Sequence, residues 1–368
     1  MNSCSHKICT DESGIALIMT VFVVAVATII VMELSSIARF DTRQTRAFTE
    51  GIQALYTLKS SLNLARELLE MKKQEGVNED WLGEPWSNIA AAPSFSIPGV
   101  KGETRLLIVD DEGKIELNSS VSAGTPGSNF PTGATLSPTT PEGSGNQDPT
   151  LSSPSIFWKN ALTELFGAAG FARGEAQGAD DGALGGQSYS AADQVAIIDD
   201  WIDPDKRSFS SAAFDGEGIE SSPGRNQFFN RKLRTLSELL RVPGMSADRL
   251  RRIAPFVRVS PNVGRTSPRV NVNTAPREVL LALGFPEFQV NEMLERRVDE
   301  TGRITQEVLN LLVEGDLLLK NYTKVTSNEF SVYSRVTMPN STRWLHAILS
   351  VGGSGNRRTT RVLTLEYY

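Results

Sequence analysis

The stretch IALIMTVFVVAVATIIVM at residues 15–32 decides how the N-terminal part of the chain folds. It contains no charged residue, and its length is close to the roughly 20 residues that a helix needs to cross about 30 Å of hydrocarbon. The alternative is a secretory signal peptide, whose apolar region is typically about 7 to 15 residues long and ends in small residues. Here the run is longer and is followed by Glu33 and Leu34. We therefore predict a retained, single-pass membrane anchor.

Beyond the anchor, apolar residues recur in steps of three and four: Phe48, Ile52, Leu55, Leu58, Leu62, Ala65 and Leu69. Such spacing keeps one face of a helix apolar. Because no proline and only one glycine, Gly51, interrupt the pattern, we predict one unbroken helix from Ile15 to Gln74. Its outer half needs a surface to pack on, either the chain's own globular domain or a neighbouring subunit.

Composition limits the kinds of protein that this chain can be. With 368 residues, 40% of them hydrophobic, it is long enough and apolar enough for a folded core outside the membrane. The net charge of -6 gives no global attraction to nucleic acid or anionic lipid, which favours protein partners. The only cysteines, Cys4 and Cys9, precede the apolar run, so the folded part has no disulfide and no thiolate metal site.

Strand patterns occur at both ends of the globular region. TRLLIVDDEGKIELN at residues 104–118 predicts two strands joined in a hairpin at the acidic turn 111–113, and KVTSNEFSVYSRVTM, TRWLHAILSVG and TTRVLTLEYY predict strands near the C-terminus. We expect the late strands to complete the sheet that opens near Thr104. The predicted fold class is α+β, in which a long N-terminal helix packs on an antiparallel sheet and an all-helical domain is inserted between the early and late strands.

These patterns set the predicted domain boundaries. They are a leader at 1–14, the transmembrane and amphipathic helix at 15–75, the first part of the α/β domain at 76–118, a Ser/Pro/Gly-rich loop at 119–155, the helical insert at 156–320 and the C-terminal strands at 321–368. Within the insert we predict helices at 156–166, 191–202, 235–240, 248–254, 276–283, 288–298 and 306–312. The composition of 119–155 predicts a mobile loop or linker, or else an irregular coil folded on the core.

The residues around the start of the apolar run resemble a known family. Ser13-Gly14 directly before the run resembles the leader of type IV prepilins, which prepilin peptidase cuts after the glycine. The resemblance implies cleavage between Gly14 and Ile15 and methylation of the new N-terminus. Pilin-like subunits mostly carry a glutamate at the fifth mature position, a carboxylate tolerated in lipid only if it pairs with a neighbour's N-terminal amine. That position is Met19 here, which resembles the minor pseudopilin family of type II secretion called protein K.

Further blocks resemble the same family, in its order, along nearly the whole chain. They are GKIELN at 113–118, AIIDDWIDPD at 196–205, NRKLRTLSELLRVPGM at 230–245, VNVNTAPREVLLAL at 270–283 and SVYSRV at 331–336. The resemblance implies a subunit at the tip of the type II secretion pseudopilus, nucleating or capping the fibre that exports folded proteins across the outer membrane. Its implied partners are other minor pseudopilins, the major pseudopilin, prepilin peptidase and the inner-membrane assembly platform. We predict that Met19, Leu55, Leu58 and Leu62 lie on the helix face that packs against other subunits.

The implied location is the inner membrane of a two-membrane bacterium, with the globular domain in the periplasm. The distribution of basic residues indicates the opposite orientation, because only Lys7 precedes the apolar run whereas Arg39, Arg43 and Arg46 follow it. We follow the resemblance, since the charge rule is statistical.

An alternative function comes from residues 236–253 and 270–298, which resemble helix-hairpin-helix units that offer backbone N–H groups to DNA phosphates. The alternative is a membrane-anchored protein for DNA binding or uptake. However, a phosphate-binding hairpin usually keeps two glycines around one apolar residue. Here Gly244-Met245 is followed by Ser246, and Gly284-Phe285 by Pro286, which has no N–H to donate. Arg249, Arg251 and Arg252 form a basic cluster, but nearby glutamates oppose it, so nucleic acid is not the predicted partner.

Acidic residues at 199–205 suggest a metal site. Asp203 and Asp205 around Pro204 fit the start of a calcium loop, and Asp215 and Glu217 are candidate further ligands. The alternative is that Asp199 and Asp200 are surface residues of a helix that Pro204 ends. The family resemblance also implies calcium in the helical domain. We predict no enzymatic activity, because the only histidines are His6 in the leader and His346 in a predicted strand, and no nucleophile motif accompanies them.

Overall fold

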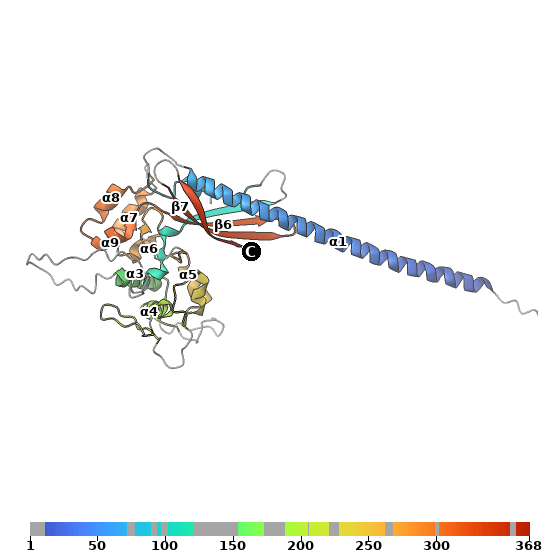
Figure 1. Ribbon diagram of the computed structural model, residues 1–368, viewed down its shortest axis with the longest axis horizontal. Helices are drawn as coiled ribbons and strands as arrows, with labels where there is room; N and C mark the ends of the chain where they lie inside the picture. The colour runs from blue at the N-terminus through green and yellow to red at the C-terminus, as the bar shows by residue number, and fades with distance from the viewer. Residues whose placement is uncertain are drawn as a thin grey trace, which may run out of the picture.

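The molecule is elongated, with one long helix projecting from a globular head (Figure 1). The computed structural model describes residues 12–71, 78–89, 94–96, 102–120, 154–172, 188–204, 206–220, 228–261, 268–298, 302–353 and 358–368. The predicted leader up to residue 11 and most of the predicted loop at 119–155 therefore lie outside the described residues.

Helix α1 (Glu12–Glu70) forms the projecting stem and one layer of the head. It is unbroken, as the uninterrupted pattern predicted, and it ends at Glu70, before the predicted Gln74. Its second half buries a face at Ala54, Leu58, Leu62, Ala65 and Leu69 against a sheet. From Leu58 to Leu69 the predicted spacing is the spacing of this buried face, whereas the predicted residues Phe48 and Ile52 are exposed.

The sheet has four antiparallel strands in the order β1-β6-β7-β8. Their bounds are β1 (Glu103–Asp110), β6 (Glu329–Thr337), β7 (Thr342–Gly352) and β8 (Thr359–Tyr367). The late strands complete the sheet that β1 opens, as predicted. Side chains alternate between two faces: the inner face, with Leu106, Val332 and Ala347, packs on α1, and the outer face points away from it. The short helix α2 (Pro85–Asn88) adds Trp86, whose ring meets that of Phe330 edge-on at 5.2 Å.

The predicted hairpin at 111–113 is wrong. After β1 the chain forms the 3-10 turn η2 (Asp111–Gly113), and β2 (Ile115–Glu116) then pairs in parallel with β3 (Val257–Arg258) instead of folding back on β1. The partner of β1 is β6 along its whole length. The acidic turn therefore directs the chain out of the sheet and into the insert.

The insert is built of short helices around its own core. Its elements are η3 (Leu117–Ser120), α3 (Pro154–Ala168), α4 (Ala191–Ile202), η4 (Leu236–Arg241), α5 (Ala247–Ile253), β4 (Val270–Asn271), α6 (Arg277–Ala282), α7 (Glu287–Arg296), α8 (Gln306–Leu312), α9 (Leu317–Tyr322) and β5 (Thr323–Lys324). Each predicted helix is present, although the one predicted at 235–240 is a 3-10 helix. Helix α9 was not predicted, and its signal is Asp316, whose side chain accepts hydrogen bonds from the N–H groups of Leu318 and Leu319.

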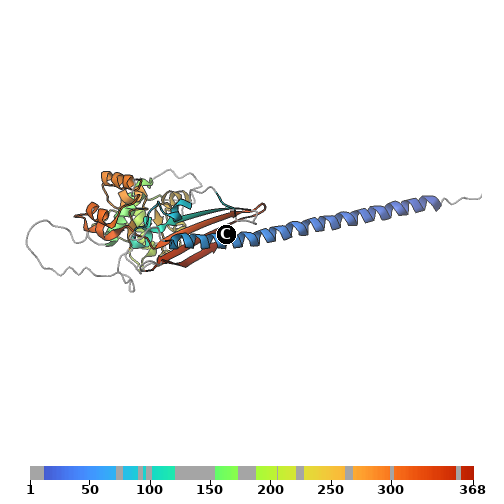
Figure 2. The same ribbon diagram turned by 90° about the horizontal axis from the view of Figure 1, so that it is seen from above.

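Two-residue strands complement the helices of the insert. The parallel pairs β2–β3 and β4–β5 lie where the insert meets the sheet. Figure 2 shows the insert gathered at the end of α1 opposite to the projecting half. The predicted α+β class, with a long helix on an antiparallel sheet and an inserted helical domain, is confirmed.

Candidate functional site

The projecting half of α1 has the length and composition of a membrane anchor. The helix contains an 18-residue window of mean hydropathy 3.0, and none of that window is buried in the molecule. Ile15 and Met19 are exposed. Gly14 and Ile15 lie in the first turn of α1, so a cut between them would leave nearly the whole helix on the mature protein.

The predicted subunit-packing residues divide into two groups. Leu58 and Leu62 are only 1% and 7% exposed and pack in the chain's own core with the sheet, so they cannot form a contact with another subunit. Leu55 is half-buried, and only Met19 is fully accessible. The prediction is corrected for Leu58 and Leu62. Periodicity identifies an apolar helix face, but it does not say which surface covers that face.

A second apolar line runs along the outside of the same helix. Phe48, Ile52 and Tyr56 follow one another at intervals of four residues, and all three are exposed in the head-proximal half of α1. Residues four apart are neighbours on a helix surface, so these side chains form a continuous line that we call the α1 stripe. Glu50 fixes the helix beside it, because its carboxylate accepts hydrogen bonds from the backbone N–H (3.0 Å) and the side-chain amide (2.9 Å) of Asn340.

A buried polar joint connects the sheet to the insert. Asp110, the last residue of β1, accepts hydrogen bonds at one carboxylate oxygen from Ser327 Oγ at 2.5 Å, Thr274 Oγ1 at 2.5 Å and Asn271 Nδ2 at 3.1 Å. Burial, together with the nearby Glu112 carboxylate, raises the pKa of Asp110 to about 6. The three donors come from the insert and from the segment that leads back into β6. This one side chain therefore ties three distant parts of the chain together.

A second part of the joint centres on Arg258 in β3. Its guanidinium lies 2.7 Å from a carboxylate oxygen of Glu329 and 3.5 Å from one of Glu116. Ser260 donates its backbone N–H to Glu116 at 2.8 Å and its hydroxyl to Glu329 at 2.7 Å. Burial raises the pKa of Glu116 to about 7, although the charge of Arg258 acts in the opposite direction. The insert is thus held to the sheet by charged groups that are themselves largely removed from water.

Two aspartates in the last turn of helix α4 are buried, so the alternative that placed Asp199 and Asp200 on the surface is wrong. Asp199 lies 3.0 Å from the Lys159 ammonium, with both side chains almost completely buried. Burial lowers the pKa of Lys159, and the charge of Asp199 opposes that change. The Asp200 carboxylate accepts hydrogen bonds from the backbone N–H groups of Phe209 (2.6 Å), Ile219 (2.6 Å) and Glu220 (2.8 Å). Asp200 therefore organises the loop that follows α4.

The predicted calcium ligands do not gather into one group. Asp203 is buried, Asp215 and Glu217 are exposed, and Asp205 lies outside the described residues. Over the described ranges, no three His, Cys, Asp or Glu side chains come close enough to hold a metal ion. The residues that are described do not by themselves fit a calcium site, and calcium binding stays a prediction.

The basic cluster behind the DNA-binding alternative is divided between the interior and the surface. Arg251 is exposed and pairs with Asp248 at 3.5 Å, whereas Arg249 and Arg252 are at least partly buried. Arg249 is 3% exposed, and its guanidinium donates hydrogen bonds to the carbonyl oxygens of Gly244, Tyr189 and Ala172 at 3.2, 3.2 and 3.1 Å. Arg252 likewise donates to the carbonyl of Ala169 at 2.9 Å. These two arginines tie loops of the insert together, so they do not form a surface that could meet DNA phosphates.

Known proteins resemble this chain in sequence and in fold. A family model described as type II secretion system (T2SS), protein K, matches residues 182–262. Type II secretion system protein K of Klebsiella pneumoniae is 22% identical over 277 residues, which are 75% of this chain and 71% of that protein. The fold is similar to a chain in the crystal structure of the GspK-GspI-GspJ complex from enterotoxigenic Escherichia coli, with a TM-score of 0.54, 18% identity, and coverage of 88% of this chain and 99% of that one.

The chain is thus similar to type II secretion protein K in sequence and in fold, as the sequence predicted. These similarities support the predicted minor pseudopilin, and the DNA-binding alternative is not favoured. The family match at residues 182–262 covers α4, the loop that Asp200 organises and the buried Arg249.

Proposed function

We propose that this protein is a member of the type II secretion protein K family and occupies the tip of the pseudopilus, where it nucleates or caps the fibre. The observation that carries this proposal is the position of the insert. It lies at the end of the sheet remote from the anchor half of α1 (Figure 1). In a fibre whose helices point their anchors downward, such a bulky domain stands where the next subunit would have to pack, which supports a terminal position.

Met19 supports the same position from the other end of α1. It is an exposed, uncharged side chain in the anchor half, at the position where related subunits carry a carboxylate. A carboxylate in hydrocarbon is tolerated when it is paired, which gives other subunits a reason to bind the N-terminal amine of a neighbour. A subunit with methionine at this position does not need to pair with a neighbour's N-terminal amine. A subunit at the end of a fibre lacks a neighbour on one side, so the methionine is compatible with that position.

The α1 stripe is the surface that we propose for other minor pseudopilins. The solved relative is part of a complex with GspI and GspJ, and we propose that this chain assembles with the corresponding subunits of its own system. Phe48, Ile52 and Tyr56 offer an apolar line that needs no rearrangement of the core, because they are already exposed. The major pseudopilin, prepilin peptidase and the inner-membrane assembly platform are the further proposed partners, with the head in the periplasm and the mature N-terminus at Ile15 methylated.

Tip position can be tested by labelling fibres. Pseudopili extended by overproduction of the major pseudopilin should bind gold-conjugated antibody against this protein at one end only. A strain that lacks the protein should give unlabelled fibres, fewer in number. Gold distributed along the fibre would overturn the tip position.

The α1 stripe can be tested separately. We expect Tyr56→Asp to reduce co-purification with the other minor pseudopilins from detergent-solubilised membranes, because a carboxylate would have to be buried between two helices. Gln53→Asp is the matched control, since Gln53 is exposed on the same helix but about 100° away from Ile52 around the axis. Equal recovery of partners with the two variants would exclude the stripe as the contact.

A further inference from the structure

The outer face of the sheet carries two rows of side chains that the described part of the chain leaves exposed or half-buried. In the β1, β6 and β7 register, Arg105 stands opposite Arg335, and Arg335 opposite Trp344. Tyr368 continues this row, because its backbone pairs with that of Trp344 at 3.0 Å in both directions. The adjacent row is Leu107, Tyr333, His346 and Glu366. Leu107, Tyr333, Trp344 and Tyr368 are between 40% and 64% exposed. We call these two rows the outer-face patch.

The arginines of the patch face each other instead of facing acids. Like charges directly opposite on neighbouring strands destabilise a sheet, yet Arg105 and Arg335 occupy such a pair. Over the described ranges neither guanidinium makes an ion pair with a carboxylate, and Arg335 instead lies over the Trp344 ring at 5.2 Å. The acids on this face are Glu103 and Glu366, at its margins. A carboxylate supplied from outside would relieve the repulsion between the two arginines.

The aromatic side chains of the patch are held in place. The Tyr333 and His346 rings stack with centroids 4.6 Å apart and an interplanar angle of 8°. Stacking of Arg335 on Trp344 restrains that pair in the same way. Tyrosine, tryptophan and arginine are the residues that most often dominate binding energy at protein interfaces. Side chains that are already ordered lose less conformational freedom when a partner binds.

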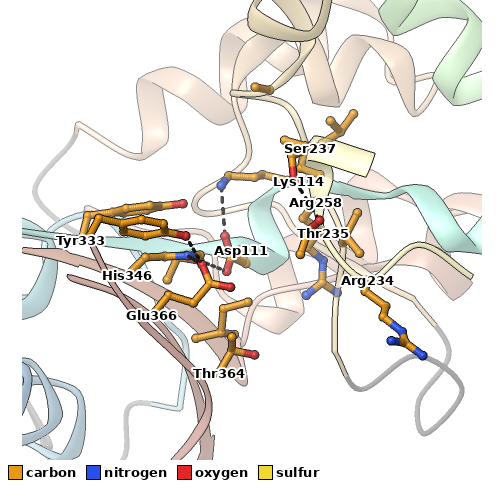
Figure 3. A pocket seen from close by; sticks show the side chains of 17 residues that line it. Asp111, Lys114, Arg234, Thr235, Ser237, Arg258, Tyr333, His346, Thr364 and Glu366 are labelled. Atoms are coloured by element: carbon orange, nitrogen blue, oxygen red, sulfur yellow. Dashed lines mark hydrogen bonds and ion pairs between the residues drawn. The ribbon is translucent and has the colours of Figure 1, made fainter. Parts of the chain in front are cut away.

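A pocket continues the patch towards the insert. It has a volume of about 320 Å³ and is lined from the sheet by Tyr333, His346, Thr364, Glu366 and Tyr368. Figure 3 shows the stacked Tyr333 and His346 across the pocket from Thr235 and Ser237 of the insert. Arg234 also lines it and is exposed. The patch and the pocket therefore form one continuous surface with arginines at both of its ends.

We propose that the outer-face patch and the adjoining pocket bind an acidic, extended segment of a partner protein. Its carboxylates would meet Arg105 and Arg335, and its apolar or aromatic side chains would lie on Trp344 and Tyr333. Charge complementarity selects this occupant, because guanidinium groups bind carboxylates in bidentate geometry. Duplex DNA fits less well, because Glu103, Glu366 and Asp111 interrupt any continuous basic track and the chain carries a net charge of -6. The patch lies on the opposite side of the sheet from α1, so the proposal is independent of fibre assembly through the α1 stripe.

The proposal can be tested with peptides of alternating sequence, which present one kind of side chain on each face when extended. Full-length protein in detergent would be titrated into a fluorescein-labelled (Glu-Val)4 peptide, and binding followed by anisotropy. We expect the double substitution Arg105→Glu and Arg335→Glu to weaken binding at least about tenfold, a loss of about 1.4 kcal/mol. The double variant should also gain affinity for a (Lys-Val)4 peptide, which a purely structural effect would not produce.

Arg343→Glu is the matched control. Arg343 is an exposed arginine of β7 whose guanidinium lies on the α1 side of the sheet, near Gly51. This variant should bind (Glu-Val)4 like the unmodified protein, and Trp344→Ala should weaken binding without reversing the charge preference. Three results would overturn the proposal: no binding of the acidic peptide, equal losses in the Arg343 control and the double variant, or tighter binding of a labelled DNA duplex than of the peptide. Melting temperatures of all variants would show that the fold is retained.

Discussion

The core between α1 and the sheet and the core of the insert are stabilised in different ways. The first is an apolar layer, in which one helix face with Leu58 and Leu62 packs on alternate residues of four strands. The second also has a large apolar cluster, but it contains the buried Lys159–Asp199 pair and the carboxylate of Asp200 that binds a loop. Long regular elements satisfy their own backbone groups. An insert of short helices and turns has many loop N–H and C=O groups, and buried charges satisfy them.

The difference indicates how each region should respond to substitution. Removal of apolar volume should weaken the α1–sheet core in proportion to the cavity that is left. Removal of a single charged partner in the insert should lower the free energy of unfolding by more than the ion pair itself contributes, because the other charge stays buried without a partner. The following predictions test that contrast, beginning with the largest expected effect.

Lys159→Met should destabilise the protein by about 4 kcal/mol, because it leaves Asp199 charged and buried without its ammonium partner. The double variant Lys159→Met with Asp199→Leu should recover most of the loss, since both charges are then absent. Chemical denaturation of full-length protein in detergent, followed by tryptophan fluorescence, measures both. If the double variant is no more stable than the single one, the insert does not depend on this charge pair in the proposed way.

Leu58→Ala should cost about 3 kcal/mol, because Leu58 is 1% exposed in the α1–sheet core. Leu107→Ala is the matched control: Leu107 lies on the outer face of the same sheet and is 43% exposed, so about 0.5 kcal/mol or less is expected. The same denaturation experiment compares them. Equal losses would contradict the assignment of inner and outer faces.

The polar joint should make stability depend on pH. Glu116 has a pKa of about 7 in the folded protein against 4.5 for the free side chain, and Asp110 about 6 against 3.8. An acid with a raised pKa holds its proton in the folded state while the unfolded state releases it. Its contribution to the free energy of unfolding is therefore fully present below about pH 4 and is lost as the pH rises to about 7. We expect a loss on the order of 3 kcal/mol for each of the two groups across this window.

Glu116→Gln should reduce the pH dependence between pH 4.5 and 7, because the amide does not titrate, and should leave the part that Asp110 contributes. Melting temperatures of both proteins at several pH values in detergent provide the comparison. Glu103→Gln is a suitable control, since Glu103 is an exposed carboxylate of β1 in the four-stranded sheet. Parallel pH profiles for Glu116→Gln and the unmodified protein would show that this carboxyl is not the titrating group.

Calcium should have the smallest effect. If Asp203 and the residues predicted with it bind calcium, millimolar CaCl2 should raise the melting temperature of the full-length protein by a few degrees through mass action. Asp203→Asn should remove that shift, whereas Glu366→Gln, far away on β8, should not. An unchanged melting temperature in calcium and in chelator, together with no heat in calorimetric titration, would refute the prediction.

The features that the sequence predicted well depend on neighbouring residues. The apolar run at 15–32, the helix that continues it and the strand at 342–352 were recognised because their periodicity is local, and the structure has a helix at Glu12–Glu70 and a strand at Thr342–Gly352. The hairpin at 111–113 was wrong because a strand pattern followed by an acidic turn does not specify the next partner. In the structure that partner is β3, which lies more than a hundred residues later in the chain.

The candidate sites show the same limit. Sequence alone placed Leu58 and Leu62 on an apolar helix face, but only the fold showed that the chain's own sheet covers that face. Asp199 and Asp200 were read as surface residues or metal ligands, and the structure buries both, against Lys159 and a loop. The sequence does not predict that Arg105 and Arg335 stand opposite each other, because strand pairing between distant segments has no local signal.

By itself, the sequence determined that this chain has one apolar anchor, a long amphipathic helix, a fold of mixed helices and strands, and the pattern of the type II secretion protein K family. These follow from periodicity and motif, which short stretches contain in full. Tertiary structure decided which apolar residues are core and which remain available to a partner, and which charges are buried. Such properties depend on pairs of residues far apart in the chain, such as Asp110 and Ser327, which are brought within hydrogen-bond distance only when the sheet and the insert close on each other.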